Sequence, residues 1–153
     1  MKGPVRKFLK VFMISLAWLI GIFLLMQAIP YGRTHKNPRT IREPAWDSPR
    51  TRELAKRACF DCHSNETRWP WYASVAPFSW VVERDVESAR EVVNFSAWQV
   101  KQPLAATSTS SVLTGNMPPV KYKMAHPEAD LTPQEMQELA HGLDETIKND
   151  PQE

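Results

Sequence analysis

Apolar and polar residues follow three successive patterns along the chain. Residues 11–29 contain no charge, residues 30–47 are polar, basic and interrupted by prolines, and apolar residues beyond them recur at helical spacing. As a helix rising about 1.5 Å per residue, the uncharged run is roughly 28 Å long, close to the ~30 Å hydrocarbon core of a bilayer. We therefore expect a basic tail at 1–10, a transmembrane anchor at 11–29 and an extended linker at 30–47.

A cleaved signal peptide is the alternative to a retained anchor. Signal peptides have a shorter apolar region of about 7–15 residues and end in a small-residue cleavage site. The run here is longer, and Gln27-Ala28-Ile29-Pro30 is a poor cleavage site. We expect retention. Basic residues flank the run on both sides, so their distribution does not determine its orientation.

The rest of the chain predicts a mostly α-helical domain at 48–148 and a polar tail at 149–153. Ser48 is a favourable N-cap and Pro49 suits the first helical position, so a helix should run from Ser48 to about Phe60. An aromatic-rich loop is expected at 64–78.

Three further helices are expected in this domain, and no sheet. Apolar residues spaced by three and four indicate a helix at about 80–93, and a weaker, serine- and threonine-rich helix is expected at 103–114. Thr132 and Glu135 form a capping box before the last helix. Its apolar stripe consists of Met136, Leu139, Ala140, Leu143 and Ile147.

Composition narrows the possible functions. The chain has 153 residues and a net charge of +2, without a basic patch, which argues against a nucleic-acid partner. Its only cysteines, Cys59 and Cys62, lie too close together to form a disulfide scaffold.

These cysteines belong to the sequence Cys59-Phe60-Asp61-Cys62-His63, a C-x-x-C-H motif typical of c-type haem attachment. The thiols form thioethers with the two haem vinyl groups, and the histidine becomes the proximal iron ligand. We therefore expect one covalently attached haem c, bound through Cys59, Cys62 and His63.

Three other interpretations of the motif are less consistent with its context. A thioredoxin-like redox pair would begin a helix in a βαβ unit, whereas this pair follows a helix. A structural zinc site needs four ligands, and His35, His126 and His141 are scattered along the chain. An incidental surface cysteine pair is the third alternative.

A second iron ligand is expected in the segment around Gly115-Asn116-Met117-Pro118-Pro119. The prolines fix φ and remove amide donors, so the Met117 thioether would lie on a rigid strap. Met124 lacks such a brace. His126, which precedes Pro127, is the stronger rival and would make the haem bis-histidine.

The motif and its surroundings resemble the bacterial haem-binding domain family of membrane-anchored c-type proteins. The resemblance covers roughly 45–147 and implies a fold similar to a monohaem cytochrome c. One departure is Ala89-Arg90, where the family tends to have Gly-Arg. The residues that carry the resemblance are Cys59 to Thr67, Trp69 to Tyr72, Ala76 to Trp80, Asp85-Val86, Asn94 to Ser96, Trp98, Met117 to Pro119, Tyr122, His126-Pro127 and Leu131-Thr132.

From these observations we expect an electron carrier and not an enzyme. It would be a single-pass protein of the bacterial inner membrane, anchored in lipid by its N-terminal helix, with the haem domain facing the periplasm or outer face and unidentified redox proteins as partners. A haem sensor or peroxide-handling enzyme with an open sixth site is one alternative. A haem-bearing structural subunit of a respiratory complex is the other.

Overall fold

The computed structural model describes residues 2–152, and within that range the secondary structure is helical, without strands. This confirms the mostly α-helical fold class, with one apolar helix at the N-terminus. The helices are α1 (Lys2–Gln27), α2 (Pro49–Ala58), α3 (Phe60–His63), α4 (Phe78–Val92), α5 (Thr107–Leu113), α6 (Val120–Ala125) and α7 (Pro133–Asn149), with 3₁₀ helices η1 (Trp71–Ser74) and η2 (Pro127–Ala129).

Two compact units make up the chain. The first consists of Met1–His35 and Pro70–Glu83, and the second of Lys36–Trp69 and Arg84–Glu153. Both the C-x-x-C-H motif and the Met117 strap therefore belong to the second unit.

In the first unit, α1 is longer than the predicted anchor at its N-terminal end. The helix includes most of the basic tail, because lysine, arginine, phenylalanine and leucine all tolerate the helical conformation. Its apolar window has a mean hydropathy of 2.4 and is not buried against protein. Length and composition therefore allow this helix to cross a bilayer.

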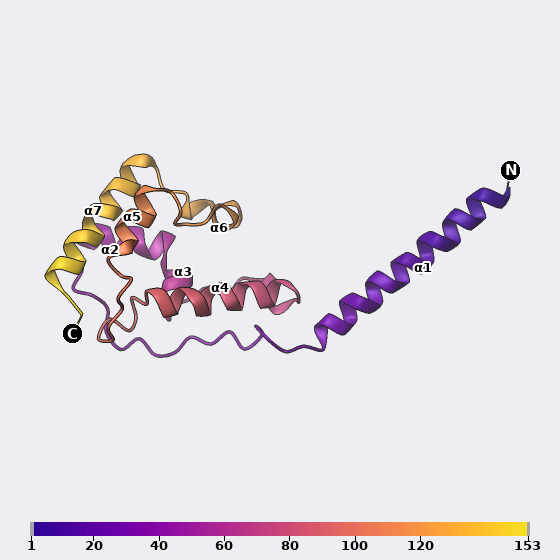
Figure 1. Ribbon diagram of the computed structural model, residues 1–153, viewed down its shortest axis with the longest axis horizontal. Coiled ribbons are helices and arrows are strands. Elements are labelled where there is room, and N and C mark those ends of the chain that lie inside the picture. Colours follow the sequence, from indigo (N-terminus) through magenta and orange to yellow (C-terminus); the bar gives the residue numbers. More distant parts are fainter. Residues whose placement is uncertain (1, 153) are drawn as a thin grey trace. The chain divides into compact units, whose positions relative to one another are not determined.

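In the second unit, α7 packs against α2 and α5 (Figure 1). Leu139, Ala140 and Leu143 of the predicted stripe are buried, and Met136 and Ile147 pack at its margin, which confirms the amphipathic interpretation of this helix. The approach to α2 is close at Gly142, where a Cβ atom would lie 1.9 Å from Thr51 Oγ1. Only a glycine therefore fits at this crossing.

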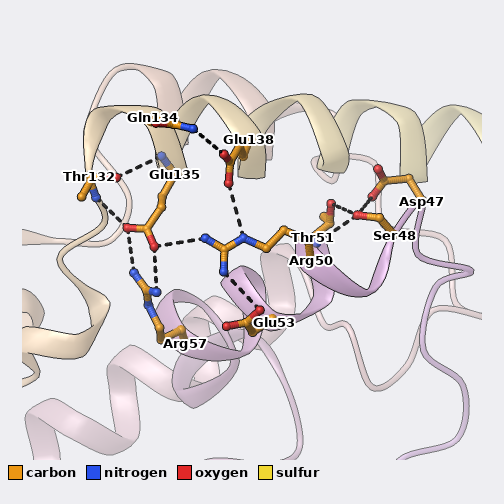
Figure 2. A network of polar contacts seen from close by, with 10 residues as sticks. All are labelled: Asp47, Ser48, Arg50, Thr51, Glu53, Arg57, Thr132, Gln134, Glu135 and Glu138. Carbon is orange, nitrogen blue, oxygen red and sulfur yellow. Dashed lines mark hydrogen bonds and ion pairs between the residues drawn. The ribbon is translucent and has the colours of Figure 1, made fainter.

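The predicted starts of α2 and α7 are confirmed by their caps. The Ser48 hydroxyl accepts a hydrogen bond from the Thr51 N–H at 3.1 Å, and Thr132 and Glu135 form both bonds of the capping box. Figure 2 shows that Glu135 also binds the guanidinium of Arg57 across the helix pair. The cap of α7 is thus joined to the surface of α2.

The predicted linker and tail are more ordered than their composition suggests. From Lys36 onward the linker belongs to the second unit. The Ile41 N–H donates to the Ser96 carbonyl at 2.9 Å, and Arg42 forms an ion pair with Asp150. The indole of Trp98 donates to the Asp150 carbonyl at 3.0 Å. Backbone hydrogen bonds and the buried Trp98 indole thus hold the linker and the tail in place, although neither segment shows a periodic pattern of apolar residues.

α4 and α5 also differ from their predicted bounds, and neither α3 nor α6 was predicted as a separate helix. α4 begins at Phe78, before the predicted start at about residue 80, and α5 begins only at Thr107. The sequence indicated nothing over α6, because six residues are too short to show helical periodicity.

Candidate haem site

The C-x-x-C-H motif lies across a break between two helices. Cys59 ends α2, donating its N–H to the Ala55 carbonyl at 2.7 Å, and its non-helical backbone begins α3. The Cys59 carbonyl then accepts hydrogen bonds from the N–H groups of Cys62 at 3.1 Å and His63 at 2.8 Å. As predicted, the preceding helix delivers Cys59 at its C-terminal end, and one short turn carries the other two residues.

His63 is fixed by two hydrogen bonds to the segment that follows α4. Its Nδ1 donates to the Val93 carbonyl at 3.0 Å, and its own carbonyl accepts the Phe95 N–H at 2.8 Å. A carbonyl can only accept, so the proton is on Nδ1 and the Nε2 lone pair is available to a metal. Burial lowers the pKa of His63, which favours this neutral, metal-binding form.

A pocket of about 70 Å³ brings together His63, the predicted proximal ligand, and the predicted strap methionine. Cys59 and His63 of the motif line it, together with Met117 from a distant segment of the second unit. The remaining wall is mostly apolar, made of Val92, Val93, Phe95, Val112 and Leu143, with Thr107, Ser108 and Ser111 on one side. This combination of a thiol, an imidazole nitrogen and a thioether in apolar surroundings fits a haem.

The pocket is smaller than the roughly 300–1,000 Å³ typical of organic cofactor sites. Binding of a macrocycle therefore requires one wall to move outward.

The surroundings of the two thiols keep both of them protonated near neutral pH. Burial raises the pKa of Cys59 to about 12 and that of Cys62 to about 11, with the nearby Asp61 and Asp85 carboxylates adding to the effect at Cys62. Reactive redox pairs instead have a thiol of lowered pKa. The thioredoxin-like alternative is therefore disfavoured by the surroundings of both thiols.

Among the candidate sixth ligands, only Met117 lines this pocket. Its N–H donates to the Ser111 carbonyl at 3.0 Å, and Gly115 turns the chain between them with φ +71°. Met124 is 81% exposed on α6. His126 stacks on Tyr122 at 4.3 Å and lies 3.5 Å from a Glu128 oxygen. The structure thus places Met117 with Cys59 and His63, and neither rival with them.

Asp61, within the motif, is a residue whose role the sequence did not reveal. It is 7% exposed and accepts three hydrogen bonds from Arg68 and one from the Tyr122 hydroxyl, the last at 2.6 Å. Burial alone would raise the pKa of Asp61, yet these donors lower it. Tyr122 lies on α6, directly after the Met117 strap, so Asp61 ties the motif to the strap.

Arg90 holds the loop that follows the motif. From α4 its guanidinium donates to the Ser64 carbonyl at 2.8 Å, to the Thr67 hydroxyl at 2.9 Å and to the Lys36 carbonyl at 3.0 Å. One side chain thereby joins the motif loop to the linker. The sequence singled out Arg90 only through the family resemblance, and did not indicate which groups it would bind.

Comparison with known proteins gives one result. A family model described as Haem-binding domain matches residues 21–145, which is more than half of the chain. The match begins inside α1, so the C-terminal part of this helix lies within the matched region. No curated protein and no solved structure matches the chain.

Proposed function

Because the chain belongs to the haem-binding domain family, we propose that it is a membrane-anchored monohaem c-type cytochrome that transfers single electrons. Haem binding follows from the family. The observation that carries the finer proposal is the pocket in which Cys59, His63 and Met117 meet.

Each of these residues has a defined role in holding the group. The thiols of Cys59 and Cys62 would add across the two vinyl double bonds. In each addition the sulfur would bond to one vinyl carbon and the thiol hydrogen would go to the other, so no oxidant is needed. His63 would offer Nε2 to the iron, since its Nδ1 proton is engaged by the Val93 carbonyl. Met117 would offer its thioether as the second ligand.

This ligand set favours electron transfer over catalysis. Bound haem supplies reversible one-electron exchange at its iron. With His63 and Met117 both bound to the iron, no coordination site would be left for a substrate. The hydrogen bonds of His63 would keep this ligand in one orientation, so little would have to rearrange when an electron is gained or lost.

The proposed location follows from α1 and from the chemistry of attachment. The helix is long and apolar enough to cross a membrane. Covalent attachment needs reduced thiols to meet exported haem, which in bacteria occurs outside the cytoplasmic membrane. The proposal therefore places the haem domain on the periplasmic or outer face, near membrane-bound redox partners.

The proposal is tested on full-length protein made in a host with active haem export and attachment. Denaturing gels stained for haem should show a band at the protein's own mass, which Cys59→Ser and Cys62→Ser each weaken or abolish. A ferric absorption spectrum should contain the weak long-wavelength band of a methionine–iron bond. Met117→Ala should remove this band and lower the reduction potential, because methionine ligation raises it.

Met124→Ala and His126→Ala are the matched controls and should leave the band unchanged. A colourless protein would contradict covalent haem binding. If His126→Ala alone alters the spectrum, the haem is bis-histidine. If none of the three substitutions matters, the sixth site is open and the sensor or peroxide-handling function replaces electron transfer.

A further inference from the structure

The end of α1 is joined to a segment far along the chain. The Gln27 side chain donates to the Ala76 carbonyl at 2.9 Å and accepts the Ala76 N–H at 3.1 Å. Ser79 donates through its hydroxyl to the Tyr31 carbonyl at 3.3 Å. The backbone of Gly32 lies so close to Ser79 that a Cβ atom on residue 32 would be 2.1 Å from the Ser79 carbonyl oxygen. These contacts hold the segment 70–82 at the C-terminal end of the apolar helix.

This segment is unusual for a surface of a water-soluble domain. No charged residue occurs from Pro70 to Val82. Trp71 is 81% exposed and Phe78 is 59% exposed, with Tyr72 set edge-on to both at 5.9 and 6.4 Å between ring centres. We call Trp71, Tyr72 and Phe78 the aromatic cluster.

Leaving the aromatic cluster in water is unfavourable, because large apolar surfaces gain free energy when they are removed from it. Tryptophan and tyrosine are the residues that favour the boundary between hydrocarbon and water, where the ring is in apolar surroundings and its polar group stays hydrated. The uncharged run of α1 ends beside Gln27, so the cluster is tethered at the depth where that boundary is expected.

We propose that the aromatic cluster inserts into the headgroup layer of the bilayer that α1 crosses, as a second membrane contact. This inference rests on the proposed anchoring. A lipid surface is the partner that fits this segment, because it exposes aromatic side chains and carries no charge. The segment is also bonded to the end of the helix that is proposed to span the membrane. The contact would restrict how far the first unit can rise from the membrane surface.

The test uses full-length haem-loaded protein in vesicles of phosphatidylethanolamine and phosphatidylglycerol. A nitroxide label is attached at Trp71→Cys, and collision rates with oxygen and with a water-soluble nickel complex are measured. Leu19→Cys in α1 is the bilayer reference, and Gln134→Cys on the exposed start of α7 is the aqueous reference. Mass spectrometry checks that each chain carries one label.

We expect the ratio of oxygen to nickel collisions at residue 71 to exceed that at residue 134 several-fold, and to lie below that at residue 19. Adding Phe78→Asp should lower the ratio at residue 71, because a charge opposes insertion. If the collision ratio at residue 71 equals that at residue 134 while the ratio at residue 19 is that of a label in hydrocarbon, the inference is wrong but the proposed anchoring is retained. If residue 19 itself is aqueous, the proposed anchoring fails and the inference fails with it.

Discussion

Tyr122→Phe isolates the link between the motif and the Met117 strap. The substitution removes one hydroxyl, which donates to Asp61 Oδ2 at 2.6 Å, and keeps the ring that stacks on His126. Hydrogen bonds to charged groups contribute about 1.5–3 kcal/mol. Asp61 Oδ2 still accepts from Arg68 at 3.1 Å, so the carboxylate is not left without a donor. The expected loss is therefore at the lower end, about 1.5 kcal/mol.

The assay is denaturant unfolding of the haem-loaded protein, with ligation followed by the methionine–iron band. A loss of about 1.5 kcal/mol lowers the folding equilibrium constant roughly tenfold. Because α6 follows the strap directly, the band should also weaken and added imidazole should bind more readily. Met124→Ala, on the same helix but exposed, should change neither measurement.

A double-mutant cycle of Tyr122→Phe with Asp61→Asn measures the pair itself. We expect a coupling free energy of about 1 kcal/mol or more. If the two substitutions are additive within about 0.5 kcal/mol, and the ligation spectrum of Tyr122→Phe is that of the wild type, the reasoning about this link is refuted.

Three other predictions concern the packing of the second unit. Gly142→Ala should destabilise the protein by about 1–2 kcal/mol in denaturant unfolding, since overpacking against Thr51 outweighs the gain in helix propensity, and Thr51→Ala should restore part of the loss. Gly115→Ala places an alanine in a left-handed backbone conformation, so it should lower the free energy of unfolding by about 1–2 kcal/mol and weaken the methionine–iron band. A band of normal intensity would show that the strap does not need this turn. Hydrogen bonds from Arg57 and Thr132 lower the pKa of Glu135 from 4.5 to about 2, so its stabilising contribution is present above pH 4.5 and is lost as the pH falls through about 2. Thermal unfolding between these pH values should show a smaller decline for Glu135→Gln than for the wild type.

Local sequence determined the features that depend on neighbouring residues alone. The Ser48 cap and the Thr132 capping box each act within one helix, so the starts of α2 and α7 were predictable, whereas α1 begins well before its uncharged run. The C-x-x-C-H motif is equally local, since Cys59, Cys62 and His63 lie within one stretch of five residues. The family match is consistent with the haem expected from that motif.

Other features depended on contacts between residues far apart in the sequence. Met117, Met124 and His126 lie in one short stretch, so sequence distance could not decide which of them is the second iron ligand. Only packing places Met117 in the pocket with His63. The bond of Asp61 to Tyr122 joins residues 61 positions apart, which no periodicity can indicate. Six-residue α6, which carries Tyr122, is stabilised by such contacts and not by propensity.

The tryptophans show the same division most directly. From composition alone, every tryptophan is a large apolar residue suited to a core. Trp98 is indeed 1% exposed, and its indole N–H donates to the Asp150 carbonyl. Trp71 is 81% exposed because the segment that carries it is bonded to the end of α1. Sequence determined that both side chains would favour apolar surroundings. Only the tertiary structure decided that Trp98 is buried inside the protein and that Trp71 faces outward, since burial depends on which distant segments pack over a residue.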